Sequence, residues 1–288
     1  MMNRKLNAFI GCDKEYEDAK IVLFGAPFDS TTSFRPGARF GCSAMRGDSF
    51  GMETYSPYQD RDLNDALVFD YGDLELPFGS PENALWQIEA FAARILADGK
   101  IPCMIGGEHL VTLGAVRAVF SKYPDLHVLH FDAHTDLRDD YLGERLSHAS
   151  VMRRVWEFLG DGRIFQFGIR SGDRAEFEWA KEHVFTGKFD FRGLKTVVEQ
   201  LKGKPVYFSL DLDVLDPSVF PGTGTPEAGG VSFQALLDAV LSLSGLNVVG
   251  FDVNELAPAY DHSGASTAAA LKILRELLLV LSPQTQKR

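Results

Sequence analysis

Residues 130–139 read HFDAHTDLRD and carry three aspartates directly after the apolar run LHVL. Asp132, His134 and Asp136 alternate along the chain, so extended backbone would place their side chains on one face. Carboxylates crowded together without a counter-ion repel one another, and some would have to protonate. A bound divalent cation removes that cost. This stretch therefore predicts a metal site, whereas a single such pair would be read as a turn or a solvated loop.

Three further motifs carry the same residue types: GGEH at 106–109, Asp211-Leu-Asp213 and DVNE at 252–255. With His109, Asp211 and Asp213 added to the first stretch, the converging set has two imidazoles and four carboxylates, which is more than the three protein ligands of a typical catalytic zinc. Two ions that share bridging carboxylates fit the number better. A ligand set rich in carboxylate and free of cysteine suits Mn²⁺ and tolerates Fe²⁺, Co²⁺ or Zn²⁺. The predicted ligands are His109, Asp132, His134, Asp136, Asp211 and Asp213.

The elements that would position these residues are short, continuous apolar runs, typical of strands buried on both faces of a parallel sheet. Such runs occupy 20–27, 66–73, 100–109, 126–134, 163–173, 205–213 and 246–255. Helical periodicity occupies 81–99, 110–123, 232–245 and 266–281. Strands alternating with helices predict a mainly parallel sheet covered by helices. All four motifs then fall at carboxyl ends of strands, where such sheets bind ligands. No repeat or linker divides the chain, so we expect one domain over 1–288.

The composition limits the partners. Of the 288 residues, 40 are acidic and 29 basic, a formal charge of −11, which disfavours nucleic acid and anionic membranes as partners and mildly favours cationic substrates. Three widely spaced cysteines, at 12, 42 and 103, give no disulfide framework. The N-terminal stretch lacks the apolar core of a signal peptide, and the chain has no run of 18 apolar residues. We expect a soluble, cytoplasmic protein.

GGEH, DAHTD, SLDLDVLDPSVFPGTGTPEAGG and DVNE, in this order, resemble the ureohydrolase family of arginases and agmatinases. The resemblance extends from SFRPGARFGCSAMR (33–46) to PAYDHSGASTAAA (258–270). Within the family it is strongest to bacterial and archaeal agmatinases, in TSFRPGARFG, DLRDDYLGERLSHAS and PGTGTPEAGG. It implies a three-layer α/β/α arginase-like fold with the metal site at the carboxyl ends of the strands. It also implies a homo-oligomer, a trimer or hexamer.

The resemblance also implies roles for individual residues. A hydroxide bridging two manganese ions would attack the guanidinium carbon, and Asp136 would orient it and help to move its proton. His148, in LSHAS, would shuttle protons, and Glu255 would pair with the substrate guanidinium. One manganese would be held by His109, Asp132, Asp136 and Asp211, and the other by His134 and Asp213, with Asp132 and Asp211 bridging.

The segment after DAHTD bears on the substrate. Arginases present neutral Asn and Ser donors to the α-carboxylate there, whereas this chain has Asp139, Asp140 and Glu144. The resemblance therefore favours hydrolysis of agmatine to putrescine and urea, a step of polyamine biosynthesis. Guanidinobutyrate and arginine remain alternative substrates. Two other classes also remain: a non-catalytic relative that acts as a binding partner, and a single-metal deacetylase on a related fold.

Overall fold

The computed structural model describes residues 7–282, and the six residues at each end of the predicted domain, 1–288, lie outside the described residues. Within that part, eight strands form one sheet in the order β4-β1-β5-β10-β9-β6-β7-β8, and every neighbouring pair is parallel. The strands are β1 Ile21–Ala26, β4 Val68–Asp73, β5 Ile101–Gly106, β6 His127–Phe131, β7 Ile164–Ile169, β8 Phe185–Lys188, β9 Pro205–Asp211 and β10 Asn247–Asn254. A small antiparallel pair joins β2 (Tyr55–Ser56) to β3 (Arg61–Asp62).

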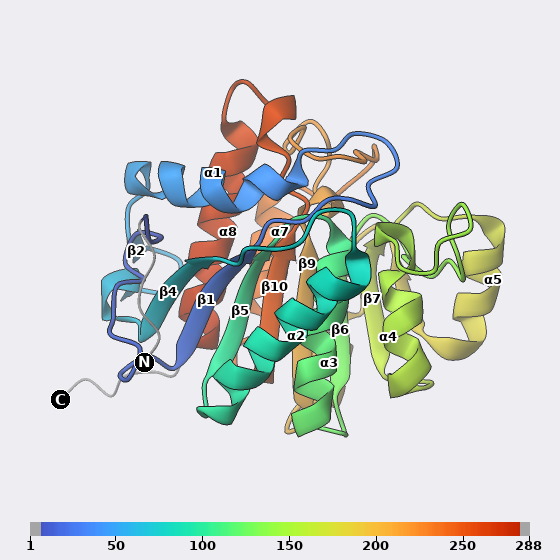
Figure 1. Ribbon diagram of the computed structural model, residues 1–288, viewed down its shortest axis with the longest axis horizontal. Helices are drawn as coiled ribbons and strands as arrows, with labels where there is room; N and C mark the ends of the chain where they lie inside the picture. Colours follow the sequence, from blue (N-terminus) through green and yellow to red (C-terminus); the bar gives the residue numbers. More distant parts are fainter. Residues whose placement is uncertain (1–6, 283–288) are drawn as a thin grey trace.

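Helices cover both faces of the sheet, which gives the three layers that the sequence predicts (Figure 1). On the near face in Figure 1 lie α2 (Pro81–Ala97), α3 (Thr112–Lys122) and α4 (Val151–Leu159). On the far face lie α7 (Phe233–Leu241) and α8 (Ala265–Leu281). The remaining helices are α1 (Gly41–Asp48), α5 (Arg174–His183) and α6 (Leu194–Leu201). Two separate hydrophobic cores result, one on each face of the sheet.

All seven predicted strands and all four predicted helices are present. The strand β8 was not predicted, because its sequence FTGK sits at the sheet edge, is only half-buried and lacks an apolar run. The helices α1, α4, α5 and α6 were not predicted either.

The sheet order explains how distant motifs meet. The strands β5, β10, β9 and β6 are consecutive neighbours in the middle of the sheet. Their carboxyl ends carry GGEH, DVNE, Asp211-Leu-Asp213 and DAHTD, respectively. The prediction that four strands bring these groups to one edge is therefore confirmed.

Two loops lie over this edge, one after β1 and one after β9, and they run side by side at the top of Figure 1, in blue and orange. Arg35 of the first loop joins them, because its guanidinium donates to the carbonyl oxygens of Thr223 (2.6 Å) and Gly224 (3.2 Å). The carboxyl edge is thereby covered by ordered backbone.

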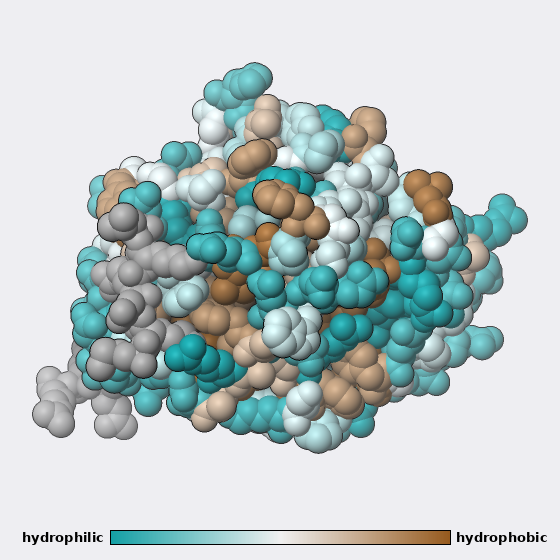
Figure 2. All heavy atoms as spheres, viewed as in Figure 1, coloured by the Kyte–Doolittle hydropathy of each residue, from teal (hydrophilic) through white to brown (hydrophobic). Residues whose placement is uncertain are grey.

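On the face seen in Figure 2, hydrophilic residues predominate and hydrophobic ones lie in separate groups. None of the helices between residues 7 and 282 is long and apolar enough to cross a membrane. Cys12, Cys42 and Cys103 are buried free thiols.

Candidate metal centre

The first group of predicted ligands surrounds the imidazole of His109, which follows β5 and is buried. Its Nδ1 lies 3.0 Å from Asp132 Oδ2, 3.1 Å from Asp136 Oδ2 and 3.4 Å from Asp211 Oδ2. Despite these short distances, Nδ1 has no hydrogen-bond partner among the described residues. One buried nitrogen and three carboxylate oxygens thus converge without bonding to one another, as ligand atoms do around a shared cation.

The second group surrounds His134, whose Nδ1 lies 3.0 Å from Asp213 Oδ2 and 3.5 Å from Asp132 Oδ1. Asp132 therefore belongs to both groups, with Oδ2 facing His109 and Oδ1 facing His134. This is the geometry of a carboxylate that bridges two ions. Asp211 lies with the first group, and its Oδ1 accepts a hydrogen bond from the Asp213 backbone N–H (2.8 Å). A bridging role for Asp211 stays a prediction.

Hydrogen bonds behind His109 fix which of its nitrogens is free to bind a cation. Its Nε2 lies 2.8 Å from Ser209 Oγ, and Ser209 in turn donates to Asp252 Oδ1 (2.7 Å). Because the Ser209 hydroxyl proton is used on Asp252, Nε2 must carry a proton, so the neutral imidazole has its lone pair on Nδ1. An acceptor of this kind for the second ring nitrogen, itself linked to a carboxylate, is the usual support for a metal-bound histidine. The donor set therefore fits divalent cations.

Burial and crowding perturb the acidic groups of the site. The pKa of Asp211 is raised well above its usual range by burial and by the neighbouring Asp213 and Asp132. Burial and Asp132 raise the pKa of Asp136 to about 6. The pKa of Glu255 is also raised, by burial and by Asp213. Such an excess of buried negative charge is relieved by bound cations.

Two of the predicted site residues have strained backbone. Asp136 has φ 53° and Glu255 has φ 68°, in the left-handed region that favours glycine. Glu255 is held there by a hydrogen bond from its backbone N–H to Gly107 O (2.9 Å), and its Oε1 accepts from the His109 backbone N–H (2.8 Å). Strain of this kind is retained where the surrounding structure enforces it, commonly at functional sites.

A cleft of about 280 Å³ opens onto these groups and is lined by His134, Asp136 and His148. His148 Nε2 lies 3.1 Å from Ser33 Oγ, which also lines the cleft. Burial, followed by the nearby His134 and His109, lowers the pKa of His148 to about 4, so its imidazole is neutral at pH 7. The structure thus brings His148 to the mouth of the site.

The acidic residues after DAHTD were expected near the substrate tail, but none of them lines the cleft. Asp139 Oδ1 accepts a hydrogen bond from Arg154 (2.9 Å), and Asp140 Oδ1 accepts one from the Gly143 N–H (3.1 Å). Glu144 lines a neighbouring cavity of about 480 Å³. The acidic groups that line the cleft beside Asp136 are instead Asp173 and Glu176, which the sequence reasoning missed.

Further residues, which the sequence motifs did not single out, support the ligands from behind. His130 and Gln166 lie beside Asp132, and Ser209 beside His109. Glu108 accepts hydrogen bonds from the Thr31 N–H (2.9 Å) and hydroxyl (2.6 Å). For His130 a signal existed, because strand alternation places it on the same face as Asp132.

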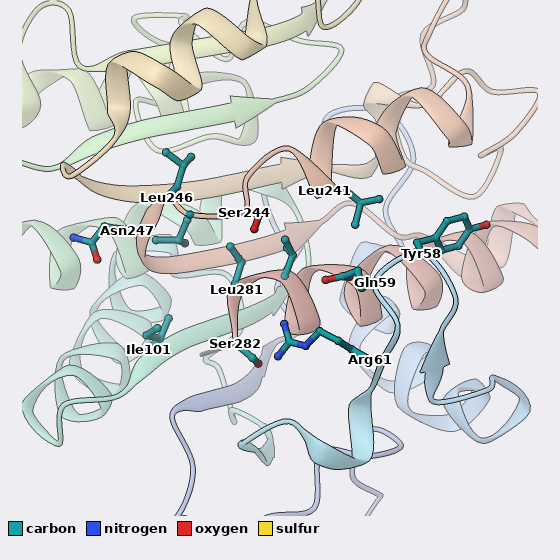
Figure 3. A pocket seen from close by; sticks show the side chains of 13 residues that line it. Tyr58, Gln59, Arg61, Ile101, Leu241, Ser244, Leu246, Asn247, Leu281 and Ser282 are labelled. Carbon is teal, nitrogen blue, oxygen red and sulfur yellow. The ribbon is translucent and has the colours of Figure 1, made fainter. Parts of the chain in front are cut away.

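A larger cavity, of about 650 Å³, lies at the opposite end of the sheet, where Ile101 begins β5 and Asn247 begins β10 (Figure 3). Among the described residues that line it, Arg61 is the only charged one, and no carboxylate or imidazole is present. The described lining of this cavity therefore lacks the metal ligands found at the carboxyl edge.

The fold and the site define an α/β protein with a carboxylate–imidazole metal centre at the carboxyl ends of a parallel sheet. Residues 19–280 match the model of the arginase family. The chain is 50% identical over 275 residues to the agmatinase of Bacillus subtilis (strain 168), covering 94% of this chain and 95% of the relative. It belongs to the arginase family.

Solved structures agree. A putative agmatinase from Clostridium difficile superposes with a TM-score of 0.90 at 50% identity, covering 93% of this chain and 99% of the other. The agmatine ureohydrolase of Thermoplasma volcanium superposes with a TM-score of 0.87 at 36% identity, covering 95% and 94%. The arginase-like fold expected from the motifs is therefore confirmed.

Proposed function

We propose that this protein is a binuclear-manganese hydrolase that converts agmatine to putrescine and urea. The observation that carries the proposal is Asp132, whose two oxygens face two separate groups of ligand atoms beside a cleft. His109, Asp132, Asp136 and Asp211 would hold one ion, and His134 and Asp213 would hold the other, with Asp132 and Asp211 shared between the two. When bound, the two ions supply Lewis acidity that generates a nucleophile from water at neutral pH.

The remaining site residues would handle protons and the guanidinium. Asp136 lines the cleft beside His109 and would accept the proton that the nucleophilic water gives up. His148 lines the same cleft, and its imidazole would relay that proton to the leaving amine. Glu255 has one oxygen engaged by the His109 N–H, which orients the carboxylate that would pair with the planar guanidinium.

The cleft walls favour a cationic tail. Arg138, which lines the cleft, lies 3.4 Å from Glu176 and 3.9 Å from Asp173. Its charge is thus already matched by two carboxylates, which leaves it poorly placed to bind a substrate carboxylate. Agmatine differs from arginine by the absence of that carboxylate. The agmatinase named among the relatives, at 50% identity, supports the same choice.

The test is urea release from Mn²⁺-loaded protein supplied with agmatine, arginine and guanidinobutyrate in parallel. We expect agmatine to give the highest kcat/KM by at least about tenfold, since the tails differ by a full charge. Comparable values for arginine or guanidinobutyrate would contradict the choice of substrate. Absence of urea from all three would favour a non-catalytic relative.

Counting bound manganese separates the two metal chemistries. Two ions per chain are expected, whereas a single-metal deacetylase would hold one. Asp132→Asn provides the matched variant, because it keeps the size of the side chain and removes the bridging charge. It should keep the fold, measured by circular dichroism, and lose most activity and one ion.

The rest of the proposal concerns the setting of the enzyme. Manganese as the bound ion, a place in putrescine and polyamine biosynthesis, and a cytoplasmic location are proposed with it. So are a homo-oligomer, trimer or hexamer, and a single domain that carries the whole activity. Metal analysis of protein purified from its source tests the identity of the ion. Light scattering tests the oligomeric state.

A further inference from the structure

His130 lies on β6, is fully buried and has no role in the function proposed above. Its Nε2 is 2.8 Å from Asp132 Oδ2, and its ring centre is 4.9 Å from that of His109. By distance alone it groups with His109, Asp132 and Asp136 as a possible metal ligand. A histidine here can act in two ways: its Nε2 either binds an ion through a lone pair or donates a proton to Asp132. The position of the proton decides between them.

Gln166, on β7, is the partner that fixes this proton. It stands opposite His130 in the register of the two strands. One end of its side-chain amide lies 2.7 Å from the Thr135 carbonyl oxygen, which can only accept, so that end must be the NH₂ group. The other end faces the Thr186 hydroxyl at 3.5 Å, consistent with an amide oxygen.

The same NH₂ group lies 3.0 Å from His130 Nδ1. With one hydrogen directed to Thr135 O, the second is directed to Nδ1, which must therefore accept. A neutral imidazole whose Nδ1 accepts carries its proton on Nε2. Nε2 then has no lone pair to offer an ion, and its proton points to Asp132 Oδ2.

We propose that His130 is a positioning residue, which holds the oxygen of Asp132 that faces the His109 group. The other oxygen, Oδ1, accepts from the His134 backbone N–H at 2.5 Å. Each oxygen of the shared carboxylate thus has its own donor, and the carboxylate cannot rotate away from either group. This inference rests on the proposed metal site and adds that the two sides of the site are supported separately.

The first test is manganese titration of metal-free protein, with bound metal measured directly. His130→Phe removes the donor and keeps a buried ring. We expect one of the two ions to bind about 10–100-fold more weakly, the usual loss when a residue that supports a ligand is changed. His130→Gln, whose amide can reach Asp132 as Nε2 does, should recover part of that affinity.

His127→Phe is the matched control. His127 lies on the same strand, is buried, and contacts the Asp125 carbonyl and the Phe165 ring, away from the ligands. It should bind two ions as the wild type does. If the wild type binds no manganese, the proposed function fails. If the wild type and His130→Phe both bind two ions equally tightly, this inference alone fails.

A second test identifies which ion depends on His130. Adding His109→Asn to His130→Phe should remove the weakened ion and leave the other bound as tightly as before, because both changes act on the same ion. Adding His134→Asn should abolish binding of the remaining ion. The reverse pattern would overturn the assignment.

Nitrogen NMR of histidine-labelled protein, loaded with a diamagnetic divalent ion, reads the proton directly. We expect His130 protonated at Nε2 and unprotonated at Nδ1. A proton on Nδ1, with Nε2 bound to the ion, would make His130 a ligand and refute the proposal. Should His130→Phe fail to fold, Gln166→Met removes the donor to Nδ1 and should weaken the same ion by a smaller factor.

Discussion

Gly107 offers a sharp test of how the GGEH motif is packed. A Cβ built at this position would lie 2.0 Å from the carbonyl oxygen of Phe28 and 2.8 Å from its backbone nitrogen and carbonyl carbon. These are backbone atoms, so no change of rotamer can relieve the overlap. The same carbonyl accepts the Glu108 N–H (2.8 Å), and the Gly107 carbonyl accepts the Glu255 N–H (2.9 Å). Gly107→Ala must therefore separate the loop after β1 from the end of β5.

Overpacking costs about 1–3 kcal/mol where side chains can adjust, and more where they cannot. We expect Gly107→Ala to lower the free energy of unfolding by about 3 kcal/mol, at the upper end of this range. For a chain of this length, a change of about 1 kcal/mol shifts the melting temperature by roughly 2 °C, so the expected fall is about 6 °C. Gly47 is the matched control, because it is exposed on α1 and a Cβ there has nothing within 4 Å. Gly47→Ala should stabilise the helix by about 0.5–1 kcal/mol.

The assay is thermal unfolding of both variants and the wild type in chelator, and again with saturating Mn²⁺. Chelator removes the added stability that bound metal confers on the folded state. The metal-loaded series reports whether the displaced loop also disturbs the site. A Gly107→Ala protein that melts at or above the wild-type temperature in chelator would refute the packing argument.

Three other predictions follow from buried or loop-closing groups. Arg46→Met leaves the fully buried Asp70 without the guanidinium that lies 2.8 Å away. It should lower the free energy of unfolding in urea by about 3–5 kcal/mol, and adding Asp70→Asn should recover part of that loss. If the losses of the two single variants simply add in the double variant, the ion pair is not the cause. Glu108 accepts two hydrogen bonds from Thr31 and so holds the loop after β1, and Glu108→Gln loses one of these acceptors. The variant should raise KM for the guanidine about tenfold, while metal analysis still finds two ions. An unchanged KM would show that these hydrogen bonds do not matter for substrate binding. Hydrogen bonds from Ser218 and from the backbone N–H groups of Gly229 and Gly230 lower the pKa of Asp216 to about 2. The ionised carboxylate therefore stabilises the fold above its unfolded pKa of about 4, and this stabilisation is lost as pH falls through about 2. Asp216→Asn should therefore differ from the wild type in unfolding free energy at pH 6 and converge with it near pH 2, and a difference independent of pH would exclude the charge as its cause.

The strands that carry the site were predictable because each is a continuous apolar run followed by acidic or imidazole side chains. LHVLHF before DAHTD and PVYFSL before Asp211 are examples. The missed helices α4 (VMRRVWEFL) and α6 (LKTVVEQL) do carry an apolar stripe at helical spacing, but they are only nine and eight residues long, so the stripe was easily overlooked. The helix α5 (RAEFEWAKEH) buries few of its residues, although Asp173 and Glu176 form a capping box at its start, which was a usable signal.

Within the site, the ligands were predictable from their types and the supporting residues were not. His130 and Gln166 are 36 positions apart, and they meet because β6 and β7 pair in one particular register. Register between parallel strands depends on the packing of the whole sheet, which one sequence does not reveal. The same limit applies to Asp139, whose partner Arg154 lies on a helix that was not predicted.

The position of β10 has a consequence for the order of assembly. This strand is the last in the sequence, yet it lies in the middle of the sheet between β5 and β9. A nascent chain can therefore form β4-β1-β5 and β9-β6-β7-β8 as two separate blocks, each with one unpaired edge facing the other. The ligands of the first block, at His109, and of the second, at Asp132 and Asp211, meet only when β10 inserts and pairs with both edges. Closure of the sheet and formation of the metal centre then occur together, once β10 has been synthesised.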